Sequence, residues 1–135
     1  MNNNFLQAIE NLHSKCHKNT KDKLYKRLVS ARTRWAKENN TTPGEIENLI
    51  LKYLGTKCPF CKEDIKVDNM SLDHRLPITR GGKRELSNLN IMCKRCNRRK
   101  GALLYEEYKS ILDFLETLPI EAKKYVLKKM SSRDY

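Results

Sequence analysis

The sequence lacks any long hydrophobic run, because no stretch of about 18 apolar residues occurs among its 135 residues. A membrane-spanning helix is therefore not expected, and neither is a membrane partner. The first residues, 1–5, also lack the basic start and the long apolar stretch of a secretory signal. We therefore expect a cytoplasmic protein, and its length suits one domain with a modest hydrophobic core.

Acidic residues are scarce relative to basic ones, with 16 against 28, which gives a formal net charge of +12. Such an excess favours a polyanionic partner and makes nucleic acid the first candidate. Residues 1–57 and residues 58–104 each hold 11 basic and 5 acidic side chains, whereas residues 105–135 hold six of each. We expect the anion to meet the first two segments.

Five cysteines in a cytosolic chain do not predict a disulfide framework, because that compartment keeps thiols reduced. Four of them form two pairs, Cys58-Pro-Phe-Cys61 and Cys93-Lys-Arg-Cys96, and Cys16 is left over. Two pairs with this spacing favour a tetrahedral zinc site over four unrelated buried cysteines. Four thiolates leave no open coordination position, so this zinc is expected to be structural.

Hydrophobic periodicity and breaker residues predict mostly helices, with two short strands in the middle. The best-marked helix starts at the cap residue Thr42 and stops at Gly55. The expected helices cover 5–12, 22–38, 43–54, 94–102 and 105–117, with one more after Pro119. The expected strands are 69–74 and 90–92. The aromatic residues expected in the core are Trp35, Tyr105, Tyr108, Phe114 and Tyr125.

The segment between the cysteine pairs has an unusual content. It holds Asp73-His74, Pro77, Gly81-Gly82 and Asn88-Leu89, and the second pair continues into Asn97 and Lys100-Gly101. In order and spacing these residues resemble the HNH endonuclease family, the ββα-metal nucleases, over roughly residues 58–104. The final His of the family name is Asn97 here, a variant that the family also uses.

The resemblance implies an α+β fold, with a ββα-metal core and structural zinc site flanked by N-terminal and C-terminal helices. It divides the chain into a basic helical segment, 1–57, a nuclease core, 58–104, and a helical segment that packs on the core, 105–135. We expect the three parts to form one compact domain.

The resemblance also implies a catalytic set of Asp73, His74, Asn88 and Asn97. His74 is expected to be the general base, because an imidazole titrates near neutral pH. Asp73 and Asn97 offer oxygen ligands, which suit Mg²⁺ or Mn²⁺. Asn88 is expected to tie down the loop and orient the strand that carries His74.

Seven basic residues around this set are expected to contact a nucleic-acid backbone, although the alternative is a solvated helix face. They are Arg75, Arg80, Lys94, Arg95, Arg98, Arg99 and Lys100.

These expectations describe a zinc-containing, metal-dependent DNA endonuclease, and the resemblance implies that its products carry 5′-phosphate and 3′-hydroxyl ends. Small members of the family are often carried by phages or mobile elements, which implies a bacterial or phage-infected cell. The main rival is a non-catalytic zinc module that only binds nucleic acid, and a protein-interaction adaptor fits the charge less well. The pair Asp73-His74 separates these hypotheses, because a binding module needs no acid and imidazole beside a phosphate.

Overall fold

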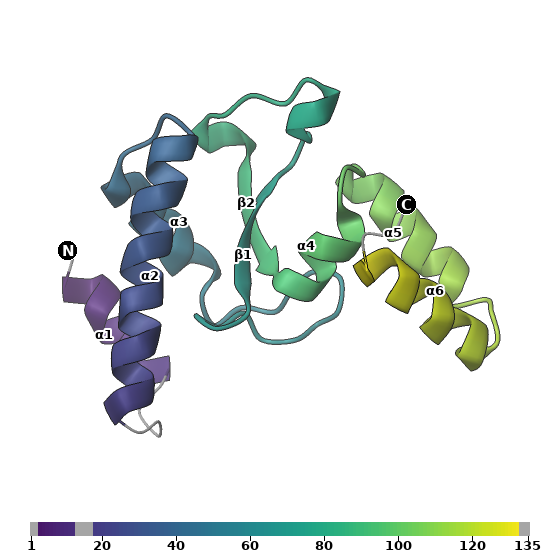
Figure 1. The fold of residues 1–135 in the computed structure, drawn as a ribbon, viewed down its shortest axis with the longest axis horizontal. Helices are drawn as coiled ribbons and strands as arrows, with labels where there is room; N and C mark the ends of the chain where they lie inside the picture. The colour runs from purple at the N-terminus through teal and green to yellow at the C-terminus, as the bar shows by residue number, and fades with distance from the viewer. Residues whose placement is uncertain (1–2, 13–17, 133–135) are drawn as a thin grey trace.

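A computed structural model describes residues 3–12 and 18–132 of the chain (Figure 1). Cys16, which the sequence leaves outside the zinc site, lies outside the described residues. The helices are α1 (Asn3–Leu12), α2 (Lys18–Glu38), α3 (Pro43–Tyr53), α4 (Lys94–Lys100), α5 (Tyr105–Leu115) and α6 (Ile120–Ser132). The strands β1 (Met70–His74) and β2 (Leu89–Cys93) form a two-stranded antiparallel sheet. The α+β fold expected from the sequence is confirmed.

The main hydrophobic core lies between the N-terminal helices and the sheet. Helix α2 turns Leu28 and Trp35 inward, α3 contributes Ile46 and Ile50, and every residue of β2 is buried. The same buried cluster continues through the cysteines to Tyr108 of α5. Residues that are far apart in the sequence therefore share one apolar interior, which holds the hairpin against α2 and α3 (Figure 1).

Local signals explain where α3 begins and ends. The Thr42 hydroxyl accepts a hydrogen bond from the Glu45 backbone N–H at 3.2 Å, which caps the helix, and Pro43 occupies its first turn. At the other end Gly55 has a φ of 82°, a conformation that suits glycine. Helix α2 begins four residues earlier than its hydrophobic pattern indicated, at Lys18.

The loop between the strands depends on its two adjacent glycines. Gly81 has a φ of 93°, in the left-handed region. A Cβ atom on Gly82 would lie 1.8 Å from the backbone oxygen of Leu76, so a larger residue does not fit there. The glycines let the chain fold back tightly after Pro77 and return to β2.

The C-terminal helices lie on the opposite side of the hairpin from α1–α3, beyond α4, which α6 contacts (Figure 1). Phe60 packs against the rings of Tyr105 and Tyr108 of α5, each with a centroid distance of 4.6 Å. Trp35 and Tyr108 are buried as expected, but the core assignment is wrong for three aromatics. Tyr105, Phe114 and Tyr125 are 37%, 62% and 63% exposed, because α5 and α6 are covered on one side only.

Among the described helices, none is long and apolar enough to span a membrane. The division into segments 1–57, 58–104 and 105–135 stays a prediction.

Candidate active site and zinc centre

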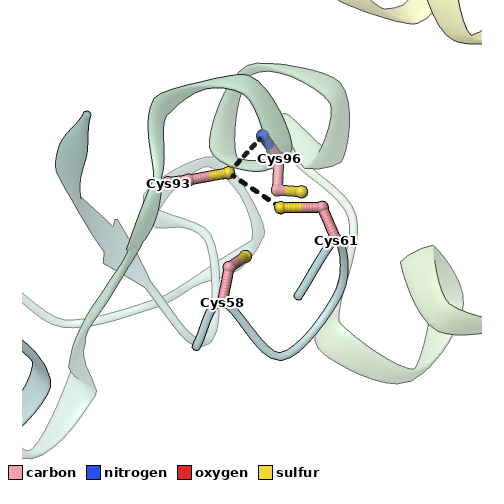
Figure 2. Close-up of side chains that lie close together, drawn as sticks. All are labelled: Cys58, Cys61, Cys93 and Cys96. Atoms are coloured by element: carbon pink, nitrogen blue, oxygen red, sulfur yellow. Dashed lines mark hydrogen bonds between the residues drawn. The ribbon is translucent and has the colours of Figure 1, made fainter. Parts of the chain in front are cut away.

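The four paired cysteines converge at one point between the 58–61 turn and the start of α4 (Figure 2). Their sulfur atoms all lie within 4.8 Å of one another, and the Sγ atoms of Cys61 and Cys93 are 3.5 Å apart. Tetrahedral zinc with Zn–S bonds near 2.3 Å requires sulfurs about 3.8 Å apart. The cluster therefore fits a zinc ion held by four thiolates.

The electrostatics of the cluster also favour a cation. The neighbouring thiols of Cys93 and Cys96 lower the pKa of Cys58 by hydrogen bonding to it. The same interaction with Cys58 raises the pKa of Cys93 to about 11 and raises the pKa of Cys96 as well. One thiolate thus opposes ionisation of the others, and a divalent ion among them removes this repulsion.

A second centre lies at the other end of the hairpin. Asp73, His74 and Asn97 border one open hollow of about 290 Å³, which residues 77–79 and 101–102 also line. Asp73 and His74 come from the end of β1, and Asn97 comes from α4. The structure therefore brings three of the four expected catalytic residues to one place, while Asn88 lies beside it.

His74 is held by a residue of the N-terminal segment. Its Nε2 atom lies 2.7 Å from Oδ1 of Asn39, which is buried just after the end of α2. The Asn39 amide nitrogen donates to the backbone oxygen of Trp35 at 2.9 Å, so its oxygen is the atom turned to His74. An oxygen acceptor requires a proton on Nε2, which leaves the lone pair of the neutral ring on Nδ1.

The surroundings of His74 favour that neutral form. Burial lowers the pKa of His74, and the positive charge of Arg84 acts in the same direction. A neutral imidazole with an unprotonated Nδ1 is able to accept a proton. The backbone oxygen of Arg84 also accepts a hydrogen bond from Asn40 at 3.2 Å, so the turn after α2 is joined to the loop after β1.

Asp73 is buried and paired with Lys100. The Lys100 Nζ atom lies 3.1 Å from Oδ1 of Asp73, and the two side chains are 0% and 6% exposed. Burial raises the pKa of Asp73, while the Lys100 ammonium opposes that rise. The sequence led us to expect Lys100 on a DNA-contacting surface, but the structure directs it inward to the carboxylate.

Asn97 joins α4 to β1. Its amide nitrogen donates to the backbone oxygen of Leu72 and to the hydroxyl of Ser71, both at 3.0 Å. These two bonds use the nitrogen and leave the amide oxygen as the atom available to a cation. Asp73 and Asn97 border the same hollow, and carboxylate and amide oxygens are hard donors of the kind that Mg²⁺ and Mn²⁺ prefer.

Asn88 fixes the loop between the strands. Its Oδ1 atom accepts a hydrogen bond from the Leu76 backbone N–H at 2.9 Å, and its amide nitrogen donates to the backbone oxygens of Leu76 and Lys83 at 3.0 Å. The backbone oxygen of Asn88 accepts from Arg75 at 2.9 Å. One side chain thus anchors the chain that leaves β1 directly after His74.

A family model describes this part of the chain. Residues 58–110 match the HNH endonuclease family. The resemblance seen in the sequence is therefore confirmed, and the match covers both cysteine pairs, the hairpin, α4 and part of α5. No curated protein matches the chain.

The basic residues of the HNH segment that were expected to contact DNA differ in their partners and in their exposure. Arg80 is paired with Glu107, and Arg95 with Glu63 at 2.8 Å. Arg99 donates to the Ser131 hydroxyl at 2.9 Å. Arg75, Lys94 and Arg98 are exposed. Among the described side chains, no carboxylate pairs with these last three, so they are the members most accessible to a phosphate.

Sequence reasoning missed Asn39. Asn is one of the residues that end helices, because it tolerates a positive φ, and Asn40 has a φ of 53°. Nothing in the local sequence indicates that Asn39 reaches a histidine 35 residues ahead. Only the packing of α2 against the hairpin brings the two side chains together.

Proposed function

We propose that the chain is a metal-dependent DNA endonuclease that hydrolyses phosphodiester bonds with His74 as the general base. The observation that carries this proposal is the hydrogen bond from His74 Nε2 to Asn39, which leaves Nδ1 unprotonated in a residue that borders the same hollow as Asp73 and Asn97. Phosphodiester hydrolysis needs a positioned base, a cation and a fixed phosphate. The hollow next to the hairpin offers side chains for the first two.

Each residue has a distinct task in this proposal. His74 takes a proton from water, and Asn39 keeps its ring in the required orientation. Asp73 and Asn97 would hold Mg²⁺ or Mn²⁺, an ion that stabilises the charge on the phosphate and on the leaving oxygen. Asn88 holds the loop that follows His74, and the zinc site fixes the end of the helix that carries Asn97.

DNA is the proposed substrate because the net charge of +12 favours a polyanion and the matched family consists of endonucleases. The expected products carry 5′-phosphate and 3′-hydroxyl ends, from either a nick or a double-strand cut. Four free cysteines suit a reducing cytoplasm, and the proposed setting is a bacterial or phage-infected cell. The rival function, a zinc module that only binds nucleic acid, gives the hydrogen bond between His74 and Asn39 a structural role alone.

Supercoiled plasmid with Mg²⁺ or Mn²⁺ tests the proposal directly. The parent is expected to convert it to nicked or linear DNA, and His74→Ala to be slower by about 10²–10⁴-fold, because general-base catalysis contributes that much. DNA affinity of His74→Ala is expected to stay near that of the parent, since the imidazole is not a phosphate ligand. Purifying both proteins in parallel controls for a contaminating nuclease, and equal cleavage rates would show that His74 is not the base.

A further inference from the structure

Helix α2 carries a row of exposed cations opposite its buried face. Its inner side packs Leu24, Leu28 and Trp35 into the core. Its outer side exposes Lys23, Lys26, Arg27, Arg34 and Lys37. None of these five is paired with a carboxylate among the side chains that the structure describes. By contrast, the partly buried Arg32 of the same helix is bound to Glu47.

The spacing of these cations follows the helix axis. Lys23, Arg27, Arg34 and Lys37 stand at i, i+4, i+11 and i+14, which keeps them on one side of an α-helix. Fourteen residues at 1.5 Å per residue span about 21 Å. At about 3.4 Å per base pair, this row matches roughly six base pairs of a duplex.

The row ends next to the candidate active site. Asn39, which follows α2, holds His74, and Asn40 holds the loop that follows β1. The charge of Glu38, the last residue of α2, acts on the His74 imidazole. Because α2 ends at Glu38, Lys37 is the member of the row nearest the hollow that Asp73, His74 and Asn97 border, and Lys23 is the farthest from it.

We propose that the exposed face of α2 binds the phosphate backbone of duplex DNA on one side of the bond that is cut. This inference rests on the proposed function, because it takes DNA as the substrate at His74. Exposed Lys and Arg side chains bind phosphates without reading the sequence and release counterions when they do so. Helix α2 thus adds to the exposed cations Arg75, Lys94 and Arg98 of the HNH segment.

Two triple variants with equal charge test the role of α2. The first is Lys23→Gln, Arg27→Gln and Arg34→Gln. The control, on α5 and α6, is Lys109→Gln, Lys128→Gln and Lys129→Gln, whose lysines are also exposed. Each variant removes three positive charges from the formal +12, so a difference between them reports position and not net charge.

The readout is the affinity for a 30-base-pair fluorescent duplex at several salt concentrations, without added Mg²⁺ or Mn²⁺. Three lost phosphate contacts are expected to flatten the slope of log affinity against log salt by about 2 to 3. The α2 variant should also bind roughly tenfold or more weakly at low salt, with the control close to the parent. Equal slopes for the two variants would overturn the proposal, as would a larger loss on double-stranded RNA than on DNA.

Hydroxyl-radical footprinting supplies a second, independent measure. The parent is expected to protect roughly six base pairs more than the α2 variant, all on one side of the cut, and an unchanged footprint would contradict the assignment. Plasmid cleavage separates this inference from the function on which it rests. If the parent cleaves and the α2 variant loses only affinity, both stand. If the parent cleaves and the two triple variants bind alike, the α2 inference alone fails.

Discussion

The hydrogen bond between Asn39 and His74 joins the N-terminal segment to the proposed chemistry. Asn39→Ala and Asn39→Asp both remove the amide group that donates to the backbone oxygen of Trp35. Only the alanine variant also removes the oxygen that accepts from Nε2 of His74. We therefore expect plasmid cleavage to fall in the order parent, Asn39→Asp, Asn39→Ala, with the alanine variant at least about tenfold slower than the aspartate variant.

Thermal unfolding of both variants is the control, because each loses the buried hydrogen bond to α2, worth about 1 kcal/mol, and Asn39→Asp also buries a carboxylate. Faster cleavage by Asn39→Asp than by Asn39→Ala, without a higher melting temperature, would support a positioning role for Asn39. Equal cleavage by the two variants would show that His74 needs no acceptor at this position.

The buried pair of Asp73 and Lys100 gives a prediction about cation binding. Lys100→Met keeps the length of the side chain but leaves the Asp73 carboxylate without its partner, at a cost of about 3–5 kcal/mol. A bound Mg²⁺ ion is expected to offset part of that cost. Added Mg²⁺ should therefore raise the melting temperature of Lys100→Met more than that of the parent.

Lys94→Met is the matched control, because Lys94 is exposed and its loss should change the free energy of unfolding by less than about 0.5 kcal/mol. An equal response of all three proteins to Mg²⁺ would argue against Asp73 as a ligand of the cation.

At the scale of single residues, the sequence predicted the contacts that depend on the spacing of residues within a motif. The four cysteines lie together because two-residue gaps bring both sulfurs of a pair to one side of a turn. The inward direction of Lys100 was not predictable, because a run of five cations in seven residues is typical of an exposed helix face. Burial of Lys100 depends on a carboxylate 27 positions away, on a strand that α4 contacts only in the folded chain.

Among the elements, β2 and α4 depend most on zinc. Cys93 ends β2, and its sulfur accepts a hydrogen bond at 3.4 Å from the Cys96 backbone N–H at the start of α4 (Figure 2). Metal binding at such a site contributes directly to folding. We predict one Zn²⁺ per chain in the parent, and for Cys93→Ser we predict loss of zinc and a free energy of unfolding lower by several kcal/mol.

Elemental analysis and thermal unfolding measure both quantities. Cys16→Ser is the control, because the proposed zinc site does not use Cys16, and it should retain zinc and stability. Folded parent protein without zinc would contradict the assignment of this centre.

Helix boundaries were predicted where capping residues mark them and missed where they do not. Thr42, Pro43 and Gly55 define the ends of α3, whereas the first turn of α2 has no comparable apolar or capping signal. The exposure of Phe114 was also missed. An amphipathic pattern gives the apolar side of α5, but it does not say how much of that side a neighbouring element covers.

On the scale of the whole molecule, the basic charge and the hydrophobic core are distributed differently over the three segments of the chain. The basic surplus lies in residues 1–104, and residues 105–135 are neutral overall. The core instead includes residues of all three segments, 1–57, 58–104 and 105–135, because side chains from α1, α2 and α3 pack with those of the hairpin and with Tyr108. The N-terminal helices therefore have two roles at once, with one face in the core and the opposite face toward the proposed DNA.

The uneven distribution of buried residues predicts different effects of shortening the chain at each end. Removing residues 1–57 takes away Asn39 and the buried side chains of Leu28, Trp35, Ile46 and Ile50, which cover the hairpin. Each large core side chain that is lost costs about 2–5 kcal/mol, so the summed cost exceeds the free energy of unfolding of a typical domain. A chain that starts at Cys58 is therefore expected to remain unfolded, to show no cooperative melting transition and to cleave no DNA.

A chain that ends at Leu118 lacks α6, in which no residue is buried. It loses the bond between Arg99 and Ser131 and the partial cover of Met130, so its melting temperature should fall by less than about 10 °C. It should keep its zinc and cleave plasmid at close to the parent rate, because every residue assigned to the chemistry is retained. Circular dichroism, zinc analysis and plasmid cleavage on both shortened chains decide the matter. A folded, active protein without residues 1–57 would show that the hairpin, the zinc site and α4 are sufficient without Asn39.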